Sequence, residues 1–163
     1  MKYIYILLIS IACLTLLGCG GGGGGGDNGV TLTPQQQEFA DAVYSFATAV
    51  NNKNKADAIN IVLPELVYNK TLEYSEFKTK LDAFIDKVTT VNFQINEVGV
   101  IFLDANEDLA EVRADVTITY NTSNVIHEIL ELNVEKYGSK FGIKKFQKYP
   151  DDGNDITAFP PTL

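Results

Sequence analysis

Basic residues and histidine are scarce in this sequence of 163 residues, which has 13 Lys and Arg against 21 Asp and Glu and a single His. The formal net charge is therefore −8. Nucleic acids and anionic lipid surfaces attract proteins with basic patches, and an acidic chain is a poor partner for either. We therefore expect no nucleic-acid binding.

The sequence also lacks an apolar run long enough to span a bilayer, which needs about 20 residues. The apolar stretch at residues 4–17 is shorter, follows the basic Lys2, and ends at the small residue Gly18. This order of a basic, an apolar and a small-residue region is typical of a signal peptide. Residues 1–18 are therefore expected to be a removable leader; a cleaved soluble secretory protein and a membrane-retained helix are the alternatives.

Leu16, Leu17, Gly18 and Cys19 form a run that resembles the lipobox (LLGC) of bacterial lipoprotein precursors. The resemblance implies cleavage before Cys19 and lipidation of its thiol, with palmitate-type acylation of the new amino terminus as well. More than one lipid chain gives a stable membrane anchor. The residue after Cys19 is Gly20 and not an Asp. By resemblance to sorted lipoproteins, this favours the outer membrane over the inner one.

Cleavage before Cys19 removes 18 of 163 residues and leaves 145, with 12 Lys and Arg against 21 Asp and Glu, a net charge of −9. Cys13 leaves with the leader, so Cys19 is the only cysteine of the mature chain. No intramolecular disulfide can form, even in an oxidising periplasm, and no thiolate remains for catalysis or metal binding. We expect no cofactor.

Composition divides the mature chain into a tether, one domain and a tail. Residues 20–26 are all glycine, and residues 19–33 have too little apolar surface to form a packed structure. Residues 34–149 have the length of a single domain. Residues 150–163 contain several Asp, Gly and Pro residues, and we expect them to be a flexible tail.

The first half of the domain has helical periodicity. Thr33, Pro34 and Gln36 form a capping-box pattern, and the apolar residues that follow predict a helix over residues 34–50. A second, shorter helix is expected around residues 56–63, stopped by Pro64, and a brief strand at residues 66–68. A third helix is expected over residues 71–88.

From residue 89 onward apolar and polar residues alternate, which is typical of strands. The alternation changes phase near Asn96, where we expect a bulge. Turns at residues 104–108, at residues 121–124 and around Gly138 divide this half into four antiparallel strands. The residues expected in the core lie on the apolar faces of these elements: Phe39, Phe46, Phe77, Leu81, Phe84, Val112 and Val116.

Three helices followed by a four-stranded antiparallel meander resemble the α+β fold of the nuclear transport factor 2-like superfamily, which includes SnoaL-like domains. The order of the elements and the final segment KFGIKKFQKY, residues 140–149, carry the resemblance; Phe141 stands where Trp is frequent. It implies a curved sheet wrapped around helices as a cone, often with an apolar cavity and often dimeric through the sheet. A cystatin-like fold, with one helix on a meander, is the alternative and leaves two helices unexplained.

Residues suited to metal binding or catalysis are few. His127 and Glu128 begin a sequence like a zinc-protease motif, but Glu131 stands where the second His is required. A calcium-loop pattern begins at Asp104, but Leu109 replaces its glycine. We therefore expect no metal site.

The alternation of side chains along its strand places Glu128 on the inward, apolar face of the sheet. We expect Ile118 to lie opposite it on the neighbouring strand. A carboxylate in an apolar cone could act as a general acid or base. We favour the alternative that a bulge near Ile129 returns Glu128 to solvent and turns His127 inward, because unpaired charged residues are rarely buried.

The sequence therefore leaves two hypotheses for the function. The first is a lipid-anchored domain without catalytic activity that holds a small apolar ligand or a protein partner in its cone or on its sheet. The second is an isomerase- or dehydratase-type enzyme that uses Glu128 with His127 or Tyr120. Four tyrosines could also supply hydroxyl groups to a ligand, although core rings are more common: Tyr44, Tyr68, Tyr74 and Tyr120.

Overall fold

The computed structural model describes residues 31–150, 153 and 157–163. Lys2, the lipobox and Cys19, with residues 19–30 of the expected tether, lie outside the described residues. Among those described, no helix is long and apolar enough to cross a membrane. The elements are α1 Pro34–Asn51, α2 Lys55–Asn60, β1 Val62–Tyr68, β2 Thr71–Leu72, α3 Tyr74–Lys87, β3 Val91–Leu103, β4 Leu109–Tyr120, β5 Asn124–Tyr137 and β6 Lys140–Tyr149.

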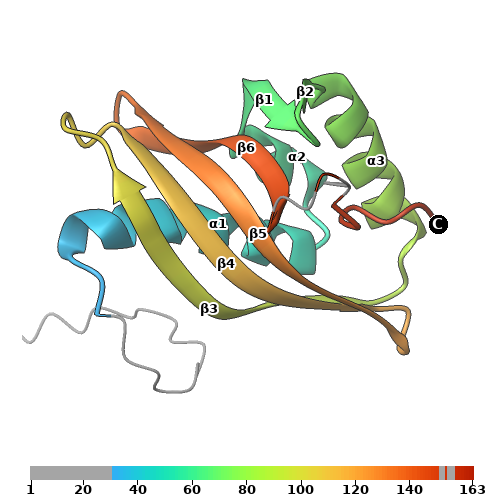
Figure 1. Cartoon of the computed structure of the whole chain (residues 1–163). Coiled ribbons are helices and arrows are strands. Elements are labelled where there is room, and N and C mark those ends of the chain that lie inside the picture. The colour runs from blue at the N-terminus through green and yellow to red at the C-terminus, as the bar shows by residue number, and fades with distance from the viewer. Residues whose placement is uncertain (1–30, 151–152, 154–156) are drawn as a thin grey trace, which may run out of the picture.

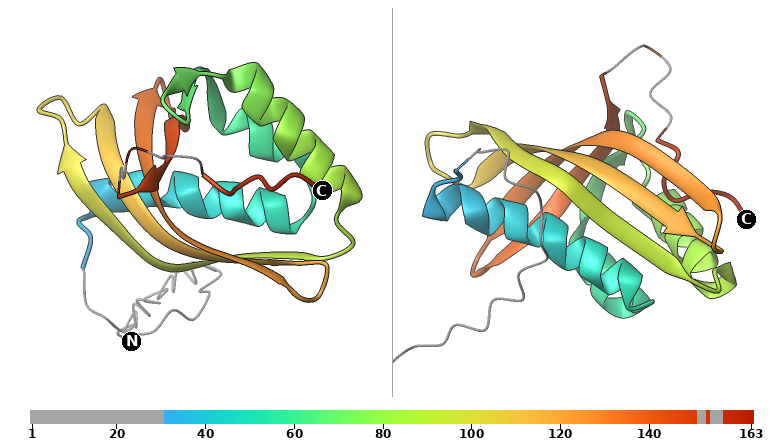
Figure 2. Two further views of the ribbon diagram at one scale, coloured as in Figure 1. Left: turned by 45° about the vertical axis from the view of Figure 1, so that its right-hand side comes forward. Right: turned by 90° about the horizontal axis from the view of Figure 1, so that it is seen from below.

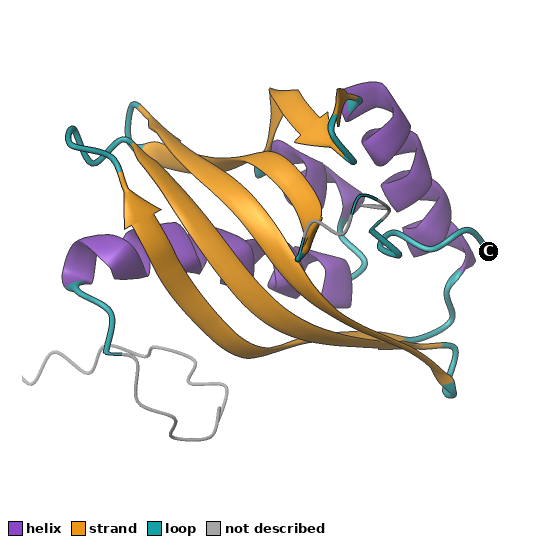
Figure 3. Ribbon diagram, viewed as in Figure 1, coloured by secondary structure: helices purple, strands orange, loops and turns teal. Residues whose placement is uncertain are grey.

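The strands form one six-stranded sheet in the order β2-β1-β6-β5-β4-β3 (Figure 1). Strands β3 to β6 make the expected antiparallel meander, and β1 extends it by pairing in parallel with β6. The sheet is therefore mixed and wider than the four antiparallel strands predicted. Figure 2 shows its curvature and Figure 3 shows the helices gathered on one of its faces.

Helix α1 begins as the sequence predicts. The Thr33 hydroxyl accepts a hydrogen bond from the Gln36 backbone N–H at 3.2 Å, and the Gln36 side chain accepts one from the Thr33 N–H at 2.9 Å. This reciprocal capping box satisfies two backbone donors at the start of the helix. The apolar stripe of α1 then packs against β3 and β6.

The segment after α1 differs from the prediction. Helix α2 ends at Asn60, and Val62 to Pro64 belong to strand β1 instead of to the helix. The register between β1 and β6 shifts between Val62 and Val67, so the strand is irregular and its apolar residues do not alternate. An irregular strand of this kind resembles a short helix in sequence. Helix α3 likewise begins at Tyr74, because Thr71 is taken by β2.

The pairing of β3, β4 and β5 follows the predicted turns. The expected bulge near Asn96 is confirmed by a register shift between Ile95 and Glu97. Strands β4 and β5 pair without interruption, with Glu128 opposite Val116. The sequence-based pairing of Glu128 with Ile118 was therefore wrong by two residues, and the bulge expected near Ile129 is absent from this pair of strands.

The core lies between the concave face of the sheet and the helices. All seven residues expected there are buried, and Phe rings from α1, α3, β3 and β6 meet at its centre. Helices α2 and α3, which an arrangement of one helix on a meander would leave unexplained, both contribute residues to this core. On the opposite face of the sheet, Asn96, Asp115, Thr117 and His127 form one hydrogen-bonded group.

Residues 157–163 correct the expectation of a flexible tail. Thr157, Phe159 and Pro160 are buried, and Figure 2 shows the segment, in red, running towards the C-terminal end of α3. We refer to residues 157–163 as the strap. Its packing extends the domain past the boundary predicted at residue 149.

Candidate functional site

Phe159 of the strap fills the centre of the concave space between the sheet and the helices. Its side chain is fully buried. The ring centroid lies 5.2 Å from that of Phe93, 5.6 Å from that of Phe84 and 6.2 Å from that of Phe46, with the ring planes near perpendicular. Such edge-to-face pairs add to the stabilisation that burial supplies. The interior that a cone-shaped fold could offer a small ligand is here occupied by the chain itself.

Three neighbouring side chains bind the main chain of the strap. The Thr157 N–H donates to Asn69 Oδ1 at 3.0 Å, and the Ala158 N–H donates to Glu128 Oε1 at 2.5 Å. The Tyr68 hydroxyl donates to the Phe159 carbonyl at 3.3 Å. Asn69 and Tyr68 come from the end of β1 and the turn after it, and Glu128 comes from β5.

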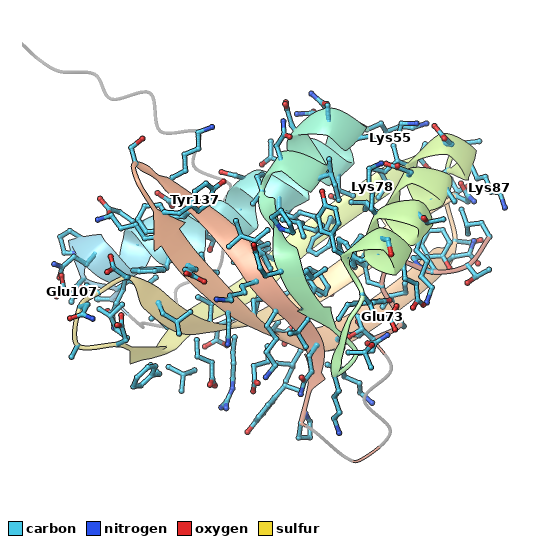
Figure 4. All side chains as sticks on the ribbon, turned by 90° about the horizontal axis from the view of Figure 1, so that it is seen from above. Lys55, Glu73, Lys78, Lys87, Glu107 and Tyr137 are labelled. Atoms are coloured by element: carbon cyan, nitrogen blue, oxygen red, sulfur yellow. The ribbon has the colours of Figure 1, made fainter. Side chains whose placement is uncertain are left out.

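A fourth side chain binds the end of the strap. Lys87, the last residue of α3, donates from Nζ to the Leu163 carbonyl at 2.6 Å. Figure 4 places Lys87 at that end of the helix. We refer to these four polar side chains, with the phenylalanine rings around Phe159, as the strap cleft.

Glu128 is buried, with 8% of its surface exposed, so its strand phase was interpreted correctly and the preferred expectation of a solvent-exposed carboxylate was wrong. Desolvation raises the pKa of Glu128 above its ordinary value, while the N–H groups of Ala158 and Phe159 and the charge of Lys148 act in the opposite direction. Glu128 Oε2 has no hydrogen-bond partner among the described residues. A carboxyl group in this position is well suited to hold a proton.

The structure does not bring the predicted catalytic residues together. His127 points to the outer face of the sheet, where its side chain is 65% exposed and Nε2 lies 2.9 Å from Asp115 Oδ1. Tyr120 pairs with Asn124, four residues along β5 from Glu128, and its ring packs on Phe84. Sequence reasoning missed two polar side chains of the strap cleft, Asn69 and Lys87. The signal for Asn69 was its position in a turn, and Lys87 gave none beyond its place at the end of a helix.

The other tyrosines differ in their surroundings. Tyr68 is buried, and its pKa is raised mainly by that burial. Tyr44 is exposed on α1, and Tyr74 lies half-buried at the start of α3. Of the four, Tyr68 is therefore the one whose hydroxyl belongs to the strap cleft.

The calcium-like sequence forms a tight turn. Asp104 Oδ1 accepts hydrogen bonds from the backbone N–H groups of Asp108 and Leu109 at 2.7 and 2.8 Å. These bonds lower the pKa of Asp104 and stabilise its charge. Within the described ranges no three His, Cys, Asp or Glu side chains are grouped so as to hold a metal ion.

A separate hollow of about 650 Å³ opens on the surface around Tyr137, which Figure 4 labels. Its wall includes Leu63, whose side chain lies over Gly142, and the ion pair of Glu135 with Lys144 at 2.6 Å. Glu128 is not among its lining residues. The hollow and the strap cleft are therefore distinct.

Comparison with known proteins shows the fold and no closer relationship. No family model and no curated protein matches the chain. Among solved structures, Bd1075 of Bdellovibrio bacteriovorus has a TM-score of 0.60 at 12% identity; the match covers 70% of this chain and only 41% of that protein. A putative scytalone dehydratase from Novosphingobium aromaticivorans has a TM-score of 0.59 at 10% identity, covering 69% of this chain and 82% of the other.

An NTF2-like protein of unknown function from Pseudomonas putida KT2440 has a TM-score of 0.58 at 10% identity, with 75% of this chain and 92% of the other covered. The chain thus has the α+β fold of nuclear transport factor 2-like proteins. At these identities the likeness establishes the fold, and function has to be argued from the residues of this chain.

Proposed function

We propose that this protein is a lipid-anchored domain of the cell envelope that binds a protein partner and catalyses no reaction. The observation that carries the proposal is the position of Phe159, which occupies the centre of the concave space where a small substrate would otherwise bind. One of the two Glu128 carboxylate oxygens, Oε1, already accepts a hydrogen bond from the Ala158 N–H.

The anchor part of the proposal rests on the leader and on Cys19, followed by the glycine run. A Gly-rich tether of ten residues has a root-mean-square end-to-end distance of roughly 16–19 Å, which suffices to hold a small domain clear of the lipid headgroups. We place the anchor in the outer membrane, in the case of a cell with two membranes, because Gly20 follows the cysteine.

Expression of Cys19→Ala beside the unmodified chain tests the anchor. The unmodified chain should incorporate labelled palmitate and sediment with membranes, whereas the variant should accumulate as an unprocessed precursor without label. Cys13→Ala is the matched control and should behave as the unmodified chain does. Normal processing and membrane attachment of Cys19→Ala would refute the anchor.

An enzyme of the isomerase or dehydratase type is the second candidate, favoured by the buried Glu128 and its raised pKa. A panel of small β-hydroxy ketones, followed by absorbance for loss of water, tests it. We expect no turnover. Turnover that Glu128→Gln abolishes, while Glu97→Gln on the exposed edge strand leaves it intact, would make the enzyme the better explanation.

A further inference from the structure

The contacts of the strap are of the kind by which proteins recognise a short peptide segment. Two successive N–H groups, of Thr157 and Ala158, each meet a side-chain oxygen, and the carbonyls of Phe159 and Leu163 each meet a donor. One side chain, that of Phe159, serves as the buried anchor. Recognition of main-chain groups together with one pocket for an aromatic side chain is a recurring mode of peptide binding.

The polar residues of the cleft come from parts of the fold that the strap does not build. Tyr68 and Asn69 belong to β1 and its turn, Lys87 to α3 and Glu128 to β5. These elements are joined to one another through β6 and the core, without the strap. The backbone that carries the polar residues of the cleft is therefore paired independently of residues 157–163.

Two polar atoms are buried where the strap meets the cleft. Glu128 Oε2 and the Thr157 hydroxyl are both buried without a hydrogen-bond partner among the residues described. A buried polar atom left in this way destabilises the arrangement that leaves it so. A ligand with an additional donor at this position would satisfy the carboxylate better than the strap does.

We propose that the strap cleft is a peptide-binding site, which the chain's own C-terminus occupies as an internal competitor. The partner is a segment of a separate envelope protein that carries a small residue, an aromatic residue and a proline in succession, as Ala158, Phe159 and Pro160 do. The inference rests on the proposed binding function and names the kind of partner for it.

Opening the cleft without removing the strap tests this inference. The full chain with Phe159→Ala, purified in detergent, lacks the anchor that holds the strap in place. A fluorescein-labelled heptapeptide with the sequence of residues 157–163 should bind the Phe159→Ala variant and raise the melting temperature of that variant. At the same concentration the peptide should neither bind the unmodified chain nor change its melting temperature. The same peptide with Ala in place of its Phe should bind about thirtyfold more weakly, the loss expected for an anchor worth about 2 kcal/mol.

Ala158 supplies a second variant, because its side chain is exposed and only its N–H contacts the cleft. Ala158→Pro removes that donor and should allow the labelled peptide to bind, whereas the control Ala158→Ser keeps the donor and should not. Ala158→Pro and Ala158→Ser replace Phe159→Ala in the binding test if the latter variant does not give the dispersed amide NMR spectrum of a folded protein.

Equal binding of the Phe and Ala peptides, or no binding to either folded variant, would overturn the proposal. Sedimentation of the unmodified chain as a concentration-dependent dimer that Phe159→Ala abolishes would also overturn it, since the ligand would then be the strap of a second copy. Cys19→Ala should leave peptide binding unchanged, so failure of the anchor and failure of the cleft are separate results.

Discussion

Asn51 at the end of α1 pairs with the backbone of Phe93 on the edge strand β3. Its amide nitrogen donates to the Phe93 carbonyl at 3.0 Å and its Oδ1 accepts from the Phe93 N–H at 2.5 Å. An edge strand presents unpaired backbone groups that can join another chain. The side chain of Asn51 satisfies two of those groups in the way that a further strand would.

Asn51→Ala removes both hydrogen bonds and should lower the free energy of unfolding by about 1–2 kcal/mol, because each net hydrogen bond contributes about 1 kcal/mol. Urea denaturation followed by circular dichroism measures this change. Ser45→Ala, on the exposed side of the same helix, is the control and should stay within about 0.5 kcal/mol. An equal effect of the two substitutions would show that the Asn51 pairing does not stabilise the fold.

Glu128→Gln should change how stability depends on pH. The pKa of Glu128 is raised in the folded state. The contribution of Glu128 to the free energy of unfolding is therefore fully present below the pKa of an ordinary carboxyl group, about 4.3, and is lost as the pH rises through the pKa of the folded state. Glutamine keeps an acceptor for the Ala158 N–H and does not titrate. The advantage of the variant over the unmodified chain should therefore grow from about pH 4 to pH 7 and reach the order of 1 kcal/mol.

Denaturant unfolding at several pH values measures this difference, and Glu97→Gln is the matched control at an exposed site. A difference that stays constant with pH, or an unmodified chain that is the more stable one at pH 7, would contradict the assignment of Glu128 as a desolvated carboxyl group.

Gly142→Ala should destabilise the sheet where β6 passes under Leu63. A Cβ atom at residue 142 would lie 2.5 Å from Leu63 Cδ2 and 3.0 Å from Tyr137 Cε1, closer than van der Waals contact allows. Overpacking of this kind typically costs about 1–3 kcal/mol. Leu63→Ala in the same chain should relieve most of that cost, so a double-mutant cycle should be strongly non-additive.

Gly99→Ala is the control for that substitution, since its Cβ would meet only Ile101 Cδ1 at an ordinary 3.7 Å. We expect no loss of stability there. If Gly99→Ala lowers the stability as much as Gly142→Ala does, the effect comes from the backbone conformation and not from crowding by Leu63.

Phe46→Ala should lower the free energy of unfolding by about 3–5 kcal/mol, the usual cost of truncating a buried phenylalanine. The Phe46 ring contacts those of Phe77, Phe93, Phe146 and Phe159, so the substitution opens a cavity at the centre of the core. Phe102→Ala, at a half-exposed residue, should change stability by less than about 0.5 kcal/mol. A cost below about 1 kcal/mol at Phe46 would contradict this packing.

Local signals in the sequence predicted most of the fold. The capping box at Thr33, the phase change near Asn96 and the alternation of β4 each depend on residues close in the chain, and each is confirmed. What could not be predicted is non-local. The parallel pairing of β1 with β6 leaves no periodic pattern in residues 62–68, because that strand is irregular.

The candidate site shows the same division. The strand phase placed Glu128 inward correctly, but the general rarity of buried charges argued against it, because its hydrogen-bond partner lies 30 residues away in the strap. The strap itself has the composition of a loop. The signal within it was Phe159, a single large aromatic residue between Ala158 and Pro160 that had no place in a solvated tail.

The parallel pairing of β1 with β6 also sets an order for folding. Val62 aligns with Ile143, so β1 finds its place in the sheet only once nearly the whole domain is available. Contacts between residues so far apart in sequence carry a loop-closure cost and slow folding. Until then the apolar residues of β1, Leu66 among them, have no place in the sheet, and the partly folded chain exposes them to solvent and to other chains.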